Sequence, residues 1–127
     1  MNSKIIHSVI FTALILSMPT VEATETHKTI PKIFQGNWSS SLENCVIDDE
    51  ANLEISKNHI TFPESDGTTI SIVTKQNIEL ALIIELSGEG EEWLSFVHYK
   101  INAKNNTLTD ITDPYAKNNL VRYRCKK

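Results

Sequence analysis

Acidic side chains are the residues of this sequence that could most readily take part in chemistry. Glu89, Glu91 and Glu92 gather in one glycine-containing segment, residues 87–92. Paired carboxylates can act as general acid and base in glycoside hydrolysis, but that reaction needs a cleft that fixes their separation, which a hairpin tip does not offer. We therefore expect no catalytic residues. The segment, with Trp93 directly behind it, is expected to be either a solvated turn or a loop that docks a protein partner.

Metal binding is not favoured by the remaining candidate ligands. His27, His59 and His98 lie far apart in the chain and match no zinc-binding spacing. The acidic segments lack the twelve-residue spacing of a helix–loop–helix calcium site. The sequence also shows no Ser, His and acid arrangement typical of nucleophilic catalysis. It therefore predicts no enzyme, no metal and no cofactor.

The first 23 residues have the three-part pattern of a cleaved signal peptide. Lys4 precedes an apolar run, Pro19 ends it, and Val21 and Ala23 place small residues before the cleavage site. The apolar run has about 14 residues, fewer than the ~20 that a membrane-spanning helix needs. We expect cleavage after Ala23, a periplasmic or secreted location, and no stable membrane insertion.

Two cysteines, Cys45 and Cys125, follow the predicted signal peptide. An exported chain meets an oxidising compartment, where an even number of cysteines indicates disulfide bonds. The alternative, a redox or metal-binding thiol pair, is not supported, because there is no C-x-x-C spacing and no histidine nearby. The sequence therefore predicts one structural disulfide between these two residues.

Charge is distributed unevenly along the chain, whose formal net charge is −4. Residues 43–93 contain twelve acidic side chains and two lysines, whereas residues 117–127 contain five basic side chains and no acid. Nucleic-acid binding needs a broad basic surface, so this distribution argues against it. The basic C-terminal segment is expected to pair with the acidic body of the protein.

After a polar segment at residues 24–32, expected to be a flexible lead-in, short runs of alternating apolar and polar residues follow one another. Residues 78–86 could be helical, since Glu, Leu and Ala favour helices, but a period of two fits all nine positions. Residues 68–75 place Ile70 and Ile72 on one face. Strands are expected at 37–41, 52–56, 59–62, 68–75, 78–86, 93–101, 107–112 and 120–125.

The connections between these strands are too short for parallel crossovers, so the strands are expected to run antiparallel. A meander of about eight strands avoids exposed edges by closing on itself. The sequence therefore predicts a single all-β domain over residues 33–127, a small up-and-down β-barrel. A two-sheet β-sandwich is the alternative.

Gly36 and Trp38, at the entry to the first strand, resemble the Gly-x-Trp signature of lipocalins and related calycin barrels. The resemblance implies a lipocalin-like barrel in which Trp38 closes one end. It also implies that an arginine of the last strand, Arg122 or Arg124, packs across the tryptophan ring as a cation–π contact.

The sequence also resembles small exported proteins of Gram-negative bacteria. The shared features are an aromatic-Gly-x-Trp opening, an early cysteine, an acidic hairpin before a tryptophan, and a terminal Tyr-x-Cys. Here these are residues 34–38, Cys45, residues 89–93 and residues 123–125. This resemblance implies a compartment and no activity.

Two functions are expected from these patterns. The first is an exported binding barrel without catalytic activity that holds a small apolar ligand, or none, inside and uses its loops for contacts. The alternative is a periplasmic inhibitor or immunity-like protein, of the kind that inhibits lysozymes, which docks a basic partner through residues 87–92. Complementary charge would speed that association.

Overall fold

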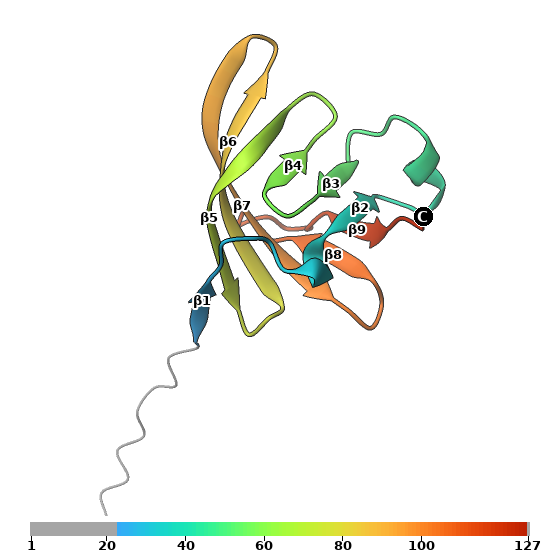
Figure 1. The fold of residues 1–127 in the computed structure, drawn as a ribbon. Helices are drawn as coiled ribbons and strands as arrows, with labels where there is room; N and C mark the ends of the chain where they lie inside the picture. The colour runs from blue at the N-terminus through green and yellow to red at the C-terminus, as the bar shows by residue number, and fades with distance from the viewer. Residues whose placement is uncertain (1–22, 127) are drawn as a thin grey trace, which may run out of the picture.

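The computed structural model describes residues 23–126, which form one antiparallel sheet that closes on itself (Figure 1). Each strand from β2 to β9 pairs with the next one along the chain, and β9 returns to pair with β2. The prediction of an eight-stranded up-and-down barrel is therefore confirmed, and the sandwich alternative is wrong. The strands are β2 Gly36–Ser39, β3 Leu53–Ile55, β4 His59–Thr61, β5 Asp66–Lys75, β6 Glu79–Gly88, β7 Glu91–Asn102, β8 Thr107–Asp110 and β9 Val121–Arg124.

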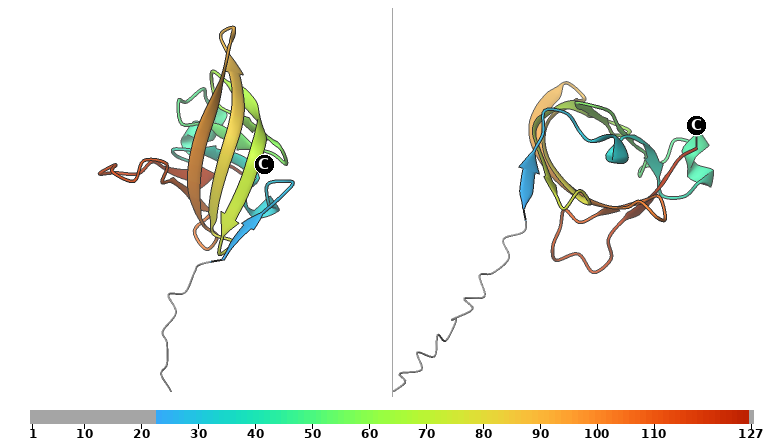
Figure 2. Two further views of the ribbon diagram at one scale, coloured as in Figure 1. Left: turned by 90° about the vertical axis from the view of Figure 1, so that its left-hand side faces the viewer. Right: turned by 60° about the horizontal axis from the view of Figure 1, so that its bottom comes forward.

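The wall of the barrel is much taller on one side than on the other. β5, β6 and β7 have 10, 10 and 12 residues, whereas the other strands of the ring have three or four. The three long strands stand side by side as a tall, twisted sheet (Figure 2, left). As a consequence, β8 covers only the last four residues of β7, Tyr99–Asn102.

Alternation along the long strands determines what fills the barrel. In β6 the side chains of Leu80, Leu82 and Ile84 are completely buried, while those between them face outward, as expected for a strand with one face on a core. In β5 the alternation is interrupted by a bulge between Thr69 and Ser71. The bulge turns Ile70 outward, so the expectation that it shares a face with Ile72 is wrong.

The two ends of the barrel differ in character. We call the end with the β4–β5 loop and the β6–β7 turn the mouth, and the opposite end the base. At the base, the short 3-10 helix η1, Lys32–Phe34, lies within the ring of strands (Figure 2, right). Phe34 is completely buried there, and Ile30 and Trp38 are each 1% exposed. The base is therefore closed by apolar side chains.

Residues 24–32, for which the polar composition predicts a flexible lead-in, are paired and packed in the structure. β1, Thr24–Thr26, pairs with the last three residues of β5, and the ring of His27 lies 2.7 Å from the hydroxyl of Thr74. The physical reason is the shortness of β4, which pairs only with the first three residues of β5. β1 occupies the edge that β4 leaves open.

The predicted disulfide between Cys45 and Cys125 is present, with the two Cα atoms 5.7 Å apart. Cys45 lies in the second 3-10 helix, η2 Glu43–Val46, which belongs to the long β2–β3 connection. Cys125 directly follows β9, and its backbone N–H donates to the carbonyl of Asn37. The disulfide therefore fastens this connection to the outside of the barrel wall near the C-terminus.

The predicted signal peptide lies outside the described residues, apart from Ala23 at its end. Within residues 23–126, no helix is long and apolar enough to cross a membrane.

Candidate functional site

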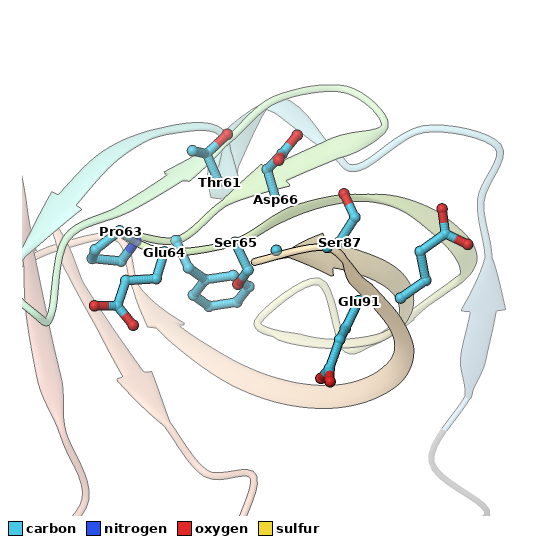
Figure 3. A pocket seen from close by; sticks show the side chains of 11 residues that line it. Thr61, Pro63, Glu64, Ser65, Asp66, Ser87 and Glu91 are labelled. Carbon is cyan, nitrogen blue, oxygen red and sulfur yellow. The ribbon is translucent and has the colours of Figure 1, made fainter.

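The mouth of the barrel is hollowed on several sides. One hollow, of about 850 Å³, lies between the β4–β5 loop and the β6–β7 hairpin (Figure 3). Carboxylates line it from both sides: Glu64 and Asp66 from the first, Glu91 and Glu92 from the second. Lysine and arginine are absent from its lining. The hollow therefore favours positively charged groups.

A second hollow, of about 470 Å³, follows the inner wall of the tall sheet. Its surface is mainly apolar, formed by Phe62, Leu86 and Val97, while Glu50 and Glu64 stand beside it. Leu86 is 5% exposed and Val97 8%, so this hollow lies directly above the packed core. It can accept an aliphatic chain that carries a positive charge.

A third hollow, of about 700 Å³, lies outside the barrel wall beside the disulfide. Both cysteines line it, together with carboxylates that include Asp48, Glu54 and Glu64. Lys126 is the one lysine or arginine among the residues that line these three hollows. Negative charge therefore continues from the mouth down one side of the protein.

Some of these carboxylates already have partners. Asp49 accepts hydrogen bonds from Ser40, Asn44 and the backbone of Ala51, and so holds the β2–β3 connection in shape. Asp66 pairs with the imidazole of His59 at 2.7 Å.

The remaining mouth carboxylates are not engaged in this way. Glu50, Glu64, Glu91 and Glu92 make no ion pair or side-chain hydrogen bond with any other residue of 23–126. All four are exposed. They are therefore available to a ligand.

Lysines gather at the base, where Glu25 and Glu79 also lie. Lys32 lies in η1, Lys57 lies between β3 and β4, and Lys104 lies between β7 and β8. All three sit at or beside turns on the base, because the strands of an up-and-down barrel place alternate connections at opposite ends. Lysine is thus more frequent at the base than along the hollows of the mouth.

The acidic segment singled out in the sequence lies at this mouth, but it is shorter than predicted. Instead of a loop over residues 87–92, only Glu89 and Gly90 connect β6 to β7. Their φ angles of 51° and 80° are typical of the two-residue turn that matches strand twist. Glu91, Glu92 and Trp93 belong to β7. Trp93 pairs with Leu86, shares its inward face, and is 41% exposed.

Three of the residues that the calycin resemblance singles out, Gly36, Trp38 and Arg124, lie close together at the base. The guanidinium of Arg124 lies 4.2 Å from the centre of the Trp38 ring and donates hydrogen bonds to the carbonyls of Ile33 and Gln35. A Cβ atom on Gly36 would lie 2.9 Å from that guanidinium. Arg124 is therefore the arginine that packs across the tryptophan.

Arg122 lies elsewhere, inside the barrel, and sequence reasoning missed its surroundings. It is 5% exposed, donates from Nε to the carbonyl of Ala51, and lies 3.8 Å from Asp110. Its guanidinium stands 5.9 Å from the ring centre of Tyr99. Burial raises the pKa of Tyr99 well above its usual value, although the charge of Arg122 partly opposes this.

Two polar atoms of this cluster, Tyr99 Oη and Arg122 Nη1, are buried without a hydrogen-bond partner. None of the three hollows described above is lined by Tyr99 or Arg122. Within residues 23–126, no group of three or more His, Cys, Asp or Glu side chains is arranged to hold a metal ion.

Fold and site together describe a small, disulfide-linked barrel with a packed interior and a hollowed end, which is consistent with a binding protein. No family model, curated protein or solved structure matches the chain. The function is therefore argued from the mouth itself.

Proposed function

We propose that this protein is an exported, non-catalytic binding protein that captures a basic protein partner at the mouth of its barrel. The observation that carries the proposal is the convergence of unengaged carboxylates from three separate parts of the chain. Glu50 comes from the β2–β3 connection, Glu64 from the β4–β5 loop, and Glu91 and Glu92 from the start of β7. Such a field attracts a basic surface and raises its association rate.

The packed interior favours a partner at the rim over a ligand deep inside. Phe34, Tyr99 and Leu108 are completely buried along the inside of the barrel. The hollows lie at the mouth and the outer wall instead, and together they offer a broad, shallow surface. Shallow surfaces of this kind suit macromolecular partners better than enclosed small-molecule sites, which bury most of the ligand.

A small apolar ligand is the second candidate, and the hollow of about 470 Å³ favours it. Phe62, Leu86 and Val97 give this hollow an apolar surface within the size range of small-molecule pockets. The carboxylates beside it would then select a ligand with a positively charged head. Native mass spectrometry of the exported protein tests this candidate, since a retained small molecule would support it and a clean apo mass would oppose it.

Export is part of the proposal and rests on two observations. The first is the signal-peptide pattern that ends at Ala23. The second is the disulfide between Cys45 and Cys125, since disulfides persist in oxidising compartments. We place the protein in the periplasm or outside the cell.

The test replaces carboxylates at the mouth without changing side-chain size. Glu64→Gln, Glu91→Gln and Glu92→Gln together should slow association with the basic partner that wild type captures from a periplasmic extract. The salt dependence of the association rate should also become flatter. Stability should hardly change, because surface substitutions usually cost within ~0.5 kcal/mol each.

A matched control makes the same change in net charge outside the three hollows. Glu25→Gln, Glu43→Gln and Asp113→Asn together replace three exposed carboxylates that line none of the three hollows. This variant should associate as wild type does. If both triple variants behave alike, net charge and not the mouth governs binding, and the proposal is wrong.

A further inference from the structure

The first half of β7 has a free edge. β7 pairs with β6 from Glu91 to Lys100, but with β8 only from Tyr99 to Asn102. Next to this ladder, His98 is also hydrogen-bonded on the β8 side. Its N–H donates to the Thr112 hydroxyl, and its carbonyl accepts from the Ile111 N–H. From Glu91 to Val97, the ladders within residues 23–126 leave this side of the strand unpaired. Figure 1 shows the β6–β7 hairpin rising above the short strands.

The direction of the backbone groups along this edge follows from two hydrogen bonds near its lower end. Ile101 donates to Ile78 on the β6 side, and His98 bonds on the β8 side. Because these directions alternate from residue to residue in an antiparallel strand, even-numbered residues face the free edge. Glu92, Leu94 and Phe96 therefore present their N–H and C=O groups there.

Side chains on the outer face of this edge are unusually apolar. Leu94 is 66% exposed and Phe96 53%, and Phe96 pairs in register with Ile83, which is 40% exposed. An exposed, apolar edge strand is a template for pairing with another chain, which natural proteins usually blunt with lysine, proline or a covering loop. Residues 91–97 contain neither lysine nor proline.

The inner side of the same edge opens onto the hollow of about 470 Å³. Ser95 and Val97, which face inward from β7, line that hollow, and Glu50 and Glu64 stand across from them. A strand laid along the edge would point its side chains alternately over Leu94 and Phe96 and into this hollow.

We infer that the free edge of β7 accepts an extended segment of a basic protein, which joins the sheet as an added strand. The inference rests on the proposed function and specifies how the partner binds. The backbone of the segment pairs with Glu92, Leu94 and Phe96. Apolar side chains cover the outer face, and lysine or arginine side chains enter the hollow, with their aliphatic stems on Leu86 and Val97 and their charges near the carboxylates.

Charge decides between this partner and a second copy of the same strand. A second β7 edge would bring Glu91 and Glu92 and no lysine or arginine, since the first such side chain of β7 is Lys100. It would leave Glu50 and Glu64 without counter-ions in the hollow. A basic segment provides both the backbone groups and the charges that the edge lacks.

The first experiment uses a synthetic peptide, Lys-Val-Lys-Val-Lys-Val-Lys, with blocked ends. We expect it to bind wild-type protein in calorimetric titrations, and we expect the scrambled Lys-Lys-Lys-Lys-Val-Val-Val peptide to bind at least about tenfold more weakly. Backbone N-methylation of alternate residues removes the donors on one side of the peptide only. Methylation of either the odd-numbered or the even-numbered peptide residues should abolish binding, and methylation of the other set should be tolerated. The reason is that the added strand pairs along only one of its edges.

The second experiment changes the protein. Leu94→Pro removes an N–H that faces the free edge and leaves the ladder to β6 intact, a position where an edge strand tolerates proline. Leu94→Thr is the matched control, since it also loses the leucine side chain but keeps the N–H. The proline variant should bind the alternating peptide about tenfold more weakly than the threonine variant, the loss expected for a backbone hydrogen bond.

Hydrogen exchange provides a readout that does not depend on any variant. Binding of the alternating peptide to wild type should slow exchange at the amides of Glu92, Leu94 and Phe96. Equal binding of the alternating and scrambled peptides, or tolerance of methylation in both sets, would overturn edge pairing. A dimer of the free protein that the alternating peptide does not dissociate would show that a second copy occupies the edge, and would also overturn it.

The outcomes separate this inference from the proposed function. If the carboxylate triple variant loses the partner but Leu94→Pro and Leu94→Thr bind alike, the acidic mouth is used without strand addition, and only the edge inference fails. If the partner binds the carboxylate triple variant as it binds wild type, the proposed function fails.

Discussion

Gly36 has a specific steric role at the base of the barrel. Its φ of 133° lies in a region that residues with a Cβ rarely adopt, and an added Cβ would meet the Arg124 guanidinium at 2.9 Å. That guanidinium is held over Trp38 and by two carbonyls. Glycine at position 36 therefore leaves room for the Arg124 side chain of β9 to lie over Trp38 of β2.

Gly36→Ala should destabilise the protein by about 1–3 kcal/mol, because it combines an unfavourable backbone conformation with a clash. Gly90→Ala is the control, since Gly90 also has a positive φ but an added Cβ would meet nothing within 4 Å. Urea unfolding of both variants measures the difference. Equal losses would mean that Arg124 moves aside freely and that the clash is unimportant.

Tyr99→Phe tests the buried hydroxyl that has no partner. Removing an unsatisfied buried group should leave the free energy of unfolding at neutral pH unchanged or raise it by up to about 1 kcal/mol. Burial also raises the pKa of Tyr99, so the folded state keeps a proton that the unfolded state releases above about pH 10. The free energy of unfolding of wild type therefore falls as pH rises above about 10.

The variant should lose less stability than wild type between pH 9 and about pH 11, as measured by urea unfolding at each pH. A loss greater than ~1 kcal/mol at neutral pH would show that the hydroxyl is hydrogen-bonded in solution, for example to a buried water.

At the scale of elements, the β2–β3 connection is the longest connection between strands of the ring, and its own contacts hold it in place. The Ser39 hydroxyl donates to the side chain of Asn52 at 2.6 Å, and this hydrogen bond joins the two ends of the connection. The Cys45–Cys125 disulfide then fastens its middle to the end of β9. This arrangement keeps the acidic residues 48–50 beside the mouth.

The disulfide should contribute about 4–5 kcal/mol, the chain-entropy value for cysteines 80 residues apart. We expect exported protein to show no free thiol, and its intact mass to increase by two alkyl groups only after reduction. Urea midpoints with and without reductant measure the stabilisation, and the Cys45→Ser, Cys125→Ser double variant should match the reduced protein. Two free thiols in native exported protein would contradict the prediction.

At the scale of the whole molecule, the ring of strands is closed by one of its shortest ladders. β2 and β9 pair through two residue pairs only, Trp38 with Arg124 and Ser39 with Tyr123. Closure therefore depends on packing around Trp38, whose indole N–H also donates to the carbonyl of Phe34 at 3.0 Å. One residue thus links the first strand, the last strand and η1.

Trp38→Ala should destabilise the whole barrel by about 3–5 kcal/mol, the usual range for a buried tryptophan. That is a large share of the ~5–15 kcal/mol typical of a single domain. Trp93→Ala is the control, because Trp93 is 41% exposed and Trp38 only 1%. It should cost clearly less in the same urea melts. A loss below ~1 kcal/mol for Trp38→Ala would show that the base is not closed by this residue.

The sequence by itself determined the features that depend on local pattern and on composition. The alternation in residues 78–86 predicted the strand that became β6, because a strand with one buried face needs a period of two. Two cysteines behind a predicted signal peptide predicted their own pairing, and the structure pairs them. Short turns between many strands predicted a closed meander.

Only the tertiary structure decided what depends on pairing between distant strands. Arg122 and Arg124 share a strand face in the sequence pattern, but the register of β9 places one beside Tyr99 and the other on Trp38. The bulge that exposes Ile70 has no local signal, and neither does the free edge of β7, which exists because β8 is short. Glu50, Glu64 and Glu91 converge because barrel closure brings separate connections to one end, and closure is set by registers and strand lengths across the whole ring.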